Sequence, residues 1–278
     1  MQAIFKRNEE KYLMTQTQAN QLINAMSSHM KPDEFGTYWV QNLYFDTENW
    51  DIIHNSMEKP FYKEKVRLRC YGMPEAADFF FLEIKKKYSG IVYKRRLSIT
   101  PADIMNHSLE EVLSKDNSQI AKELKYHIQK MGVTEKFFLA YYRQAFAGAG
   151  MEDDGLRLTI DSNISYRLDM LHFTQPQLGC ATLDSNTFLL EIKTPLSIPL
   201  WLVRILDELG IFPSSFSKYA TCFTDWIGQS KKVVLSKGSA DGTSSVERRD
   251  LRYLAGDGNC ERNFLSNELI DRKVIEVA

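Results

Sequence analysis

Residues 63–69 read Lys-Glu-Lys-Val-Arg-Leu-Arg, so that a cation stands at every second position. On the other phase Val66, Leu68 and Cys70 are apolar. A period of two is the geometry of a β-strand, whose successive side chains point to opposite faces. One face of this strand is therefore positively charged, whereas the other face can pack on a hydrophobic layer.

The positive face of this strand is unfavourable by itself. Two cations ~6 Å apart repel each other by about 3 kcal/mol at an effective dielectric constant of ~20. A sheet gains nothing by aligning such side chains unless an anion lies on them. The segment therefore indicates an anion-binding surface that is built on a strand.

The same alternation recurs in five later segments. These carry Glu83, Lys85 and Lys87; Lys94 and Arg96; Tyr141 and Arg143; Arg157 and Thr159; and Glu191 and Lys193. A solvated sheet face usually mixes both signs to form cross-strand pairs, and acids are rare here. Six such strands favour a barrel with a cationic lumen, whose apolar outer faces would be covered by helices.

Eight segments of the chain show strand periodicity. Strands are expected at residues 3–13, 38–45, 62–72, 79–88, 91–99, 136–147, 156–161 and 187–193. Helices are expected over 16–30, from Pro101 onward, over 118–131 and over 199–209, with a turn at 32–36. Many strands with a few interspersed helices predict an α+β fold with a large antiparallel sheet.

The character of the chain changes at Gln229. Ser, Gly, Asp and charged residues dominate positions 236–263, and no apolar period is visible there. We therefore expect two parts, a folded domain at 1–228 and a poorly ordered extension at 229–278 with at most a short helix near 264–274.

Composition narrows the classes of function. The 278 residues carry a net charge of −1, so the cationic strands are a local feature and no nucleic-acid partner is expected. Four scattered cysteines without a CxxC pair predict reduced thiols in a cytoplasmic protein. The N-terminus lacks the apolar core of a signal peptide, and the most apolar stretch, 198–206, is too short to span a bilayer.

Three acids, Glu9, Glu83 and Glu191, are expected to point into the same lumen as the cations. Ion pairs with the surrounding lysines and arginines are one interpretation of these acids. The other is that one or more of them hold Mg²⁺ or Mn²⁺, which can bridge carboxylate and phosphate oxygens. The five histidines show no metal-ligand spacing.

These segments resemble the triphosphate tunnel metalloenzymes, a CYTH-like superfamily, and within it the vacuolar transporter chaperone (VTC) branch of polyphosphate polymerases. The first strand of the superfamily reads Glu-x-Glu-x-Lys, and Arg7-x-Glu9-x-Lys11 departs from it at the first position, as the VTC branch does. Further matching segments are 43–47, 65–72, 82–87, 90–96, 141–146, 189–193 and 216–219. The resemblance covers residues 4–225 and is that of a stand-alone bacterial type, with neither the SPX domain nor the transmembrane segments of the fungal proteins.

The resemblance implies a closed, eight-stranded antiparallel β-tunnel with helices packed outside, which binds a triphosphate and a divalent metal. The residues expected to contact phosphate are Lys11, Lys65, Arg67, Arg69, Lys85, Lys94, Tyr141, Arg143, Arg157, Ser217 and Lys218. Of these, Lys218, Arg67 and Arg69 are the expected catalytic residues. Glu191 is the expected metal ligand, with Glu9 and Glu83 as further candidates. One position departs from the fungal enzymes, because Ser215 stands where they often have lysine.

The implied activity is that of a polyphosphate polymerase, which transfers the γ-phosphate of ATP to a growing chain with the help of Mn²⁺ or Mg²⁺. ATP and inorganic polyphosphate are the expected partners. Two alternatives stay open. A triphosphatase of the same superfamily would need a residue that activates water, and hydrolytic members tend to carry more acids in the tunnel. A non-catalytic polyanion-binding module would bind with strong salt dependence and without turnover.

Overall fold

The computed structural model describes residues 8–89, 91–150, 153–173 and 175–238. Its strands are β1 (Asn8–Thr15), β2 (Met30–Asp46), β3 (Tyr62–Tyr71), β4 (Phe80–Tyr88), β5 (Ile91–Ile99), β6 (Thr134–Gly148), β7 (Arg157–Arg167), β8 (Cys180–Ala181) and β9 (Thr187–Thr194). Its helices are α1 (Gln16–Ala25), α2 (Asp51–Met57), α3 (Pro101–Asn106), α4 (Leu109–Lys115), α5 (Gln119–Met131), α6 (Leu200–Glu208) and α7 (Lys218–Gly238), with a 3₁₀ turn at Pro74–Ala76.

Tertiary contacts divide the chain into two units, Met1–Gly228 and Gln229–Ala278. The first unit holds the sheet, and the description below concerns it alone. Most of the second unit, including the helix expected near 264–274, lies outside the described residues. The expectation of poor order there stays a prediction.

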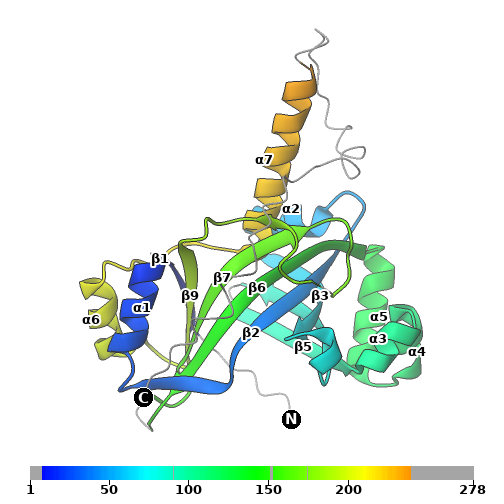
Figure 1. Ribbon diagram of the computed structural model, residues 1–278. Helices are drawn as coiled ribbons and strands as arrows, with labels where there is room; N and C mark the ends of the chain where they lie inside the picture. The colour runs from blue at the N-terminus through cyan, green and yellow to red at the C-terminus, as the bar shows by residue number, and fades with distance from the viewer. Residues whose placement is uncertain (1–7, 90, 151–152, 174, 239–278) are drawn as a thin grey trace. The chain divides into compact units, whose positions relative to one another are not determined.

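The sheet is antiparallel and runs in the order β1-β9-β7-β6-β2-β3-β4-β5, with β8 paired to β7 (Figure 1). An α+β fold with a large antiparallel sheet is thus confirmed, but a closed eight-stranded tunnel is not. The sheet has nine strands, and among the described residues no ladder joins its edge strands β1 and β5. The strand that the sequence did not predict is β8, Cys180–Ala181, whose two residues are too few to show any periodicity.

One outer face of the sheet is covered by α3, α4 and α5. Leu68 of β3 and Leu82 of β4 lie directly opposite each other in their ladder and belong to a buried cluster with Leu113 of α4 and Leu124 of α5. Leu68 is the apolar residue between the cations Arg67 and Arg69. The alternation in residues 63–69 therefore places one side of β3 in a hydrophobic core, as the sequence predicts.

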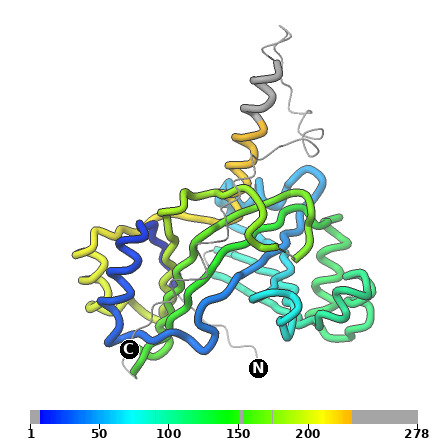
Figure 2. The backbone as a smooth tube through the Cα atoms, viewed as in Figure 1, coloured from blue at the N-terminus to red at the C-terminus, as the bar shows by residue number. Residues whose placement is uncertain are grey.

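A second helical layer covers the other end of the sheet. Helices α1 and α6 are far apart in the sequence but lie side by side in both views (Figures 1 and 2). Leu22 of α1 and Leu202 of α6 pack with Leu158 of β7 and Leu190 of β9. Helix α1 begins at a capping box formed by Thr15 and Gln18, at the predicted position.

Helix α7 packs on the opposite side of the sheet from these layers. Tyr219, Cys222 and Phe223 form a third cluster with Tyr44 of β2 and Phe137 of β6. The rings of Tyr44 and Tyr219 are stacked, with centroids 4.2 Å apart. Because Tyr44 faces the same way as the cations of the neighbouring strand, α7 fills one end of the surface that carries them.

The turn expected at 32–36 is an irregularity within the long strand β2. The pairing of β2 with β6 shifts register between Pro32 and Thr37. Inside this bulge the side chain of Asp33 accepts hydrogen bonds from the backbone N–H groups of Phe35 and Gly36, at 3.0 and 3.1 Å. Gly36 adopts a φ of 61°, which glycine tolerates without strain.

The state of the cysteines and the presence of membrane-spanning helices can be compared with the structure. Cys70 and Cys222 are free and buried, which agrees with the predicted reduced thiols at these two positions. None of the helices in the described part of the chain is long and apolar enough to cross a membrane.

The fully buried carboxylate of Asp46 joins α2 and α7 to the sheet. It accepts hydrogen bonds from the N–H groups of Ile52 (2.9 Å) and Ile53 (3.0 Å) in the first turn of α2, and from the hydroxyl of Tyr219 (3.1 Å). Burial raises the pKa of Asp46, although these donors and the N–H of Thr47 oppose the rise. The two helices thus share one acceptor.

We expect Asp46→Ala to lower the free energy of unfolding by about 2–4 kcal/mol, because it leaves several buried donors unpaired. The control Tyr219→Phe removes a single hydrogen bond and should cost about 1 kcal/mol. Urea unfolding of both variants measures the difference. Equal losses would contradict the shared-acceptor role of Asp46.

Candidate functional site

The side chains on the uncovered phase of the strands form one surface, which we term the charged face. Its members are Lys11, Lys65, Arg67, Arg69, Glu83, Lys85, Lys94, Arg96, Tyr141, Arg143, Asp161, Glu191 and Lys193, together with Lys218 from α7. Residues directly opposite in an antiparallel pair share a face. The pairs Arg67–Glu83, Glu83–Arg96, Arg143–Asp161 and Lys11–Glu191 connect strands in this way.

Glu83 is the acid at the centre of β3, β4 and β5. It is 1% exposed, and one of its oxygens accepts hydrogen bonds from Nε and Nη2 of Arg67, at 2.9 and 2.8 Å. Its other oxygen lies 2.7 Å from Nζ of Lys94 and 2.7 Å from Nε of Arg96. Burial by itself would raise the pKa of Glu83, but these cations lower it far below its ordinary value. Glu83 therefore holds cations in place, which argues for the ion-pair interpretation.

A second group of ion pairs lies where α7 meets β6, β7 and β9. Nζ of Lys218 is 2.6 Å from both Asp161 and Glu191. The guanidinium of Arg143 donates two hydrogen bonds to Asp161, at 2.7 and 2.8 Å, and lies 3.5 Å from Glu191. Lys193 completes the group, 3.0 Å from Glu191. These contacts fix the first residue of α7 against three strands.

The charge states in this second group follow from its contacts. Burial would raise the pKa of Glu191, yet Lys218, Lys193 and Arg143 lower it well below its ordinary value. Arg143 and Lys218 lower the pKa of Asp161 in the same way against burial. Conversely, the two acids raise the pKa of Lys218 although burial would lower it. Asp161, Glu191 and Lys218 are therefore ionised at neutral pH.

Tyr141 and Arg69 connect the two groups. Nη2 of Arg69 is 3.5 Å from the hydroxyl of Tyr141, and its Nε donates to the side chain of Asn42 at 2.8 Å. The ring of Tyr141 lies 4.7 Å from Nζ of Lys218 and 5.1 Å from the guanidinium carbon of Arg143. Cation–π contacts of this kind stabilise closely spaced cations.

Lys65 and Lys85 carry charge that no acid neutralises by an ion pair within the described residues. Burial lowers the pKa of Lys65 to about 7, with the nearby Lys63, Lys85 and Lys11 as further causes. Its Nζ lies 5.4 Å from the ring of Tyr219. The pKa of Lys85 is also lowered, by burial first, although Glu9 opposes the change. This end of the charged face therefore has a surplus of cations.

The charged side chains of β1, Glu9 and Lys11, interact with residues of both β9 and β4. Nζ of Lys11 lies 3.3 Å from Glu9 and 4.0 Å from Glu191, and it donates to the backbone oxygen of Phe216 at 3.1 Å. Burial would raise the pKa of Glu9, but Lys85 and Lys11 lower it overall. The sheet thus curves enough for β1 and β4 to influence each other electrostatically, although they do not pair.

Most of the expected phosphate-binding residues lie together, but three differ in their surroundings. Arg157 is turned away from the ion pairs, because its guanidinium, 48% exposed, lies 3.3 Å from Asp33 of the β2 bulge. Lys94 is 40% exposed on the edge strand β5. Ser217 precedes α7, and its hydroxyl is 3.5 Å from the N–H of Ala220 in the first turn.

The sequence reasoning missed Asp161, which is fully buried and pairs with both Arg143 and Lys218. The alternation Arg157, Thr159 continues to Asp161, so an extension by one step would have found it. Arg96 and Lys193 were assigned to the right strand faces but not to the site. Tyr44 of the third hydrophobic cluster is buried and also accepts a hydrogen bond from Nη1 of Arg67 at 3.2 Å.

A complete metal site does not exist among the described residues, since no three His, Cys, Asp or Glu side chains gather closely enough to hold an ion. Glu191 and Glu9 interact with each other across Lys11. Mg²⁺ is often bound by one or two carboxylates plus substrate phosphates and water. The chain can thus supply the carboxylate part of a metal site whose remaining ligands come with the phosphate.

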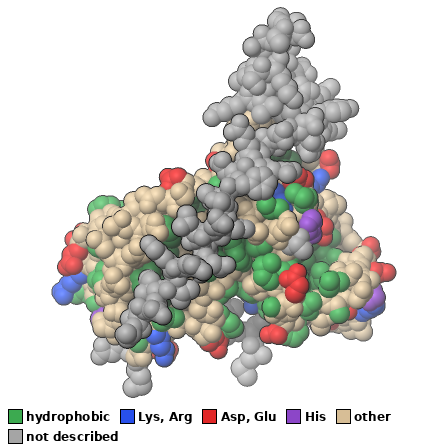
Figure 3. Space-filling view, in the orientation of Figure 1, with side chains coloured by type: hydrophobic (Ala, Val, Ile, Leu, Met, Phe, Trp, Pro, Cys, Tyr) green, Lys and Arg blue, Asp and Glu red, His purple; other side chains and the backbone are tan. Residues whose placement is uncertain are grey.

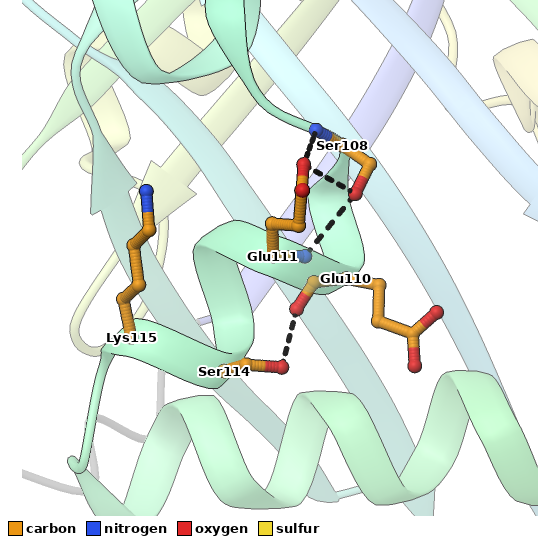
Figure 4. Close-up of a pocket in the computed structure, with 5 residues that line it drawn as sticks. All are labelled: Ser108, Glu110, Glu111, Ser114 and Lys115. Carbon is orange, nitrogen blue, oxygen red and sulfur yellow. Dashed lines mark hydrogen bonds between the residues drawn. The ribbon is translucent and has the colours of Figure 1, made fainter.

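On the face of the molecule seen in Figure 3, the Lys and Arg side chains of the described residues are few and scattered. A hollow over α4 is lined by Ser108, Glu110, Glu111, Ser114 and Lys115 (Figure 4). Ser108 and Glu111 cap the helix reciprocally, and the hydroxyl of Ser114 donates to the backbone of Glu110. The polar groups of this hollow therefore stabilise α4 itself.

The comparison with protein-family models agrees with the sequence resemblance. The family model described as VTC domain matches residues 6–227. Among solved structures, the PH1819 protein from Pyrococcus horikoshii OT3 is 13% identical at a TM-score of 0.42, over 78% of this chain and 99% of its own. A protein from Vibrio parahaemolyticus described as a "putative adenylate cyclase" is 11% identical at a TM-score of 0.45, over 79% of this chain and 98% of its own. No match was found among curated proteins.

The surplus charge at Lys65 makes anion binding dependent on pH. With a pKa of about 7, this side chain is mostly neutral at pH 8, whereas a bound phosphate stabilises its charged form and raises the pKa. Binding then takes up a proton above pH 7, so the affinity for tripolyphosphate should fall there by at most about tenfold per pH unit. Calorimetric titration from about pH 6.5 to 8.5 measures the slope.

The matched control for this measurement is Lys65→Arg, which stays charged throughout the range. Its affinity should fall less with rising pH than that of the wild type, because the phosphate and all other titrating groups are the same in both proteins. Identical slopes for the two proteins would show that Lys65 does not meet the anion.

Proposed function

Because the chain belongs to the VTC domain family, we propose that it is a phosphoryl-transfer enzyme that extends inorganic polyphosphate with the γ-phosphate of ATP. The substrates would be ATP and the growing polyphosphate chain, both of which are polyanions. The observation that carries the proposal is the surplus of cations at Lys65 and Lys85 beside two ordered groups of ion pairs.

The charged face supports binding of several successive phosphates. Arg67, Arg69 and Arg143 present guanidinium groups, which suit phosphate oxygens because they can donate two parallel hydrogen bonds. Glu83 and Asp161 hold Arg67 and Arg143 in fixed orientations, so little ordering is needed when the ligand binds. Lys65 and Lys85 would regain full charge on contact with phosphate, which adds to the binding free energy.

In the proposed reaction a terminal oxygen of polyphosphate attacks the γ-phosphorus of ATP. The bond from that phosphorus to the β,γ-bridging oxygen breaks, and ADP leaves with the electron pair. Transfer of this kind depends mostly on positioning and on neutralising the charge of the phosphoryl oxygens. Arg67, Arg69 and Lys218 would supply that neutralisation, and no protein nucleophile is needed.

The electrostatics of the acidic residues favour transfer to phosphate over hydrolysis with a carboxylate as the base. A residue that activates water must accept a proton, and it does so best when its pKa lies near the working pH. The carboxylates of the charged face are instead held by cations at pKa values below their ordinary range. They are therefore weak bases, whereas the terminal oxygen of polyphosphate is already ionised and needs no base.

Metal dependence belongs to the same proposal. Mn²⁺ or Mg²⁺ would be held by Glu191, and Glu9 could add a second carboxylate, with phosphate oxygens as the other ligands. The ion would add positive charge next to the transferred group. Enclosure of the substrate between β1 and the β3–β5 edge, as in a closed tunnel, is supported by the mutual effect of Glu9 and Lys85 on their pKa values.

Incubation of the purified protein with ATP and Mn²⁺ tests this function. We expect an acid-stable polymer that shifts the fluorescence of DAPI, together with ADP in equal amount to the phosphate incorporated. Glu191→Gln should reduce the rate by about 100-fold or more, as the loss of one preorganised electrostatic group commonly does. Circular dichroism should show that the variant stays folded.

Lys136→Gln is the matched control, because it removes a lysine whose ion pair with Glu48 lies outside the charged face. It should leave the rate unchanged. Release of orthophosphate without polymer would instead favour the triphosphatase alternative. Binding of tripolyphosphate without turnover in the presence of either metal would favour the non-catalytic module.

A further inference from the structure

Four aromatic side chains form a continuous group at the end of the charged face that lies away from α7. They are Phe35, Tyr38, Tyr71 and Phe81, which we term the aromatic patch. Successive ring centroids are 6.3, 6.0 and 5.7 Å apart, and the ring planes meet at 83°, 76° and 66°. In an edge-to-face pair the edge of one ring lies against a face of the other. The ring surface left for another planar group is therefore largest at Phe35, which is exposed, whereas the other three rings are half-buried.

The aromatic patch continues the rows of cations on the strands. Tyr71 stands two residues after Arg69 on β3, and Phe81 stands two residues before Glu83 on β4. Two residues along a strand span about 7 Å. The hydroxyl of Tyr71 accepts hydrogen bonds from Arg69 at 3.2 Å and from Arg96 at 3.3 Å. Phe81 lies directly opposite Arg69 in the ladder, so the patch begins in the row of Arg69 and extends one step further at Tyr71.

Arg96 joins the aromatic patch to the ion pairs most directly. Its guanidinium carbon lies 4.4 Å from the ring centroid of Phe81, while its nitrogens contact Glu83. Tyr38 extends the patch toward the second group of ion pairs, because it lies opposite Arg143 in the β2–β6 ladder. A ligand that contacts both regions would have an anionic part and a planar apolar part.

Phe35 is the most open member of the aromatic patch, at 65% exposure. It lies in the β2 bulge, where Asp33 accepts hydrogen bonds from the N–H groups of Phe35 and Gly36. Arg157 contacts the same Asp33 at 3.3 Å. Arg157, expected to bind phosphate, is thus placed to brace the segment that presents Phe35.

The two ends of the charged face differ in chemistry. The end near α7 carries Lys65 and Lys85, which form no ion pair within the described part of the chain, and so can attract further phosphates. The other end carries the aromatic patch, in which the exposed ring of Phe35 continues the rings that Arg69 and Arg96 contact. A nucleoside triphosphate has the same polarity, since its phosphates are anionic and its base is a planar ring system.

We propose that the aromatic patch binds the nucleobase of the nucleoside triphosphate whose phosphates lie on the charged face. This inference rests on the proposed function, because it takes a nucleotide as the substrate. Stacking on aromatic rings tolerates every base, since each has a π face. The patch therefore distinguishes nucleoside triphosphates from inorganic triphosphate more than it distinguishes one base from another.

The test compares Phe35→Ala with the wild type in binding of ATP and of tripolyphosphate, measured by calorimetry or by competition with a fluorescent nucleotide. We expect the affinity for ATP to fall about tenfold, which is typical for the loss of one stacking ring, and the affinity for tripolyphosphate to stay unchanged. Phe35→Trp keeps a stacking surface and should retain ATP binding. Phe61→Ala is the matched control, since Phe61 is also 65% exposed but lies just before β3, at the opposite end of that strand from Tyr71.

An equal loss of affinity for ATP and tripolyphosphate in Phe35→Ala would overturn the proposal, because the bulge would then act on the phosphate site. Unchanged affinity for both ligands would overturn it as well. These outcomes differ from failure of the proposed function, which would appear as absence of polymer in the turnover assay. Selective loss of ATP binding supports the inference even in a protein that makes no polymer.

Discussion

The structure depends on how a sheet can hold many like charges on one face. Repulsion among neighbouring cations would separate the strands unless acids were placed between them. Glu83 neutralises part of the charge on β3, β4 and β5, and Asp161 with Glu191 does so on β6, β7, β9 and α7. The remaining charge at Lys65 and Lys85 is left for an anion from outside. An anion bound beside these two lysines would therefore lower the free energy of the charged face.

The apolar side of the same strands supplies the stability that this arrangement requires. Leu68 and Leu82 pack under α4 and α5, while Leu158 and Leu190 pack under α1 and α6. Each of these leucines stands next to a charged residue of its strand, and burial of the leucine holds the charged side chain on the opposite face. On the opposite face of the sheet, the carboxylate of Asp46 holds α2 and α7 by accepting hydrogen bonds from both helices.

The sequence predicts the strands well because alternation of charge and apolar residues is a local property that β3 shows over its whole length. It also places Arg67, Arg69, Arg143 and Glu191 on one surface. Helix α7 was missed because Tyr219, Cys222 and Phe223 derive their role from packing on distant strands. Arg157 follows the strand alternation, but its guanidinium reaches the bulge at Asp33, and no rule of spacing reveals that contact. Closure of the sheet likewise depends on long-range curvature, which periodicity does not encode.

Lys218 is the first residue of α7, and the residues that follow it are held in the third hydrophobic cluster. An α-helix turns about 100° per residue. A slip of a single residue in the packing of Tyr219 and Phe223 would therefore swing the ammonium group away from both of its carboxylate partners. The hydrophobic contacts of the helix thus set the position of the ammonium group of Lys218. A substitution that disturbs this cluster would therefore displace the charge before it unfolds the sheet.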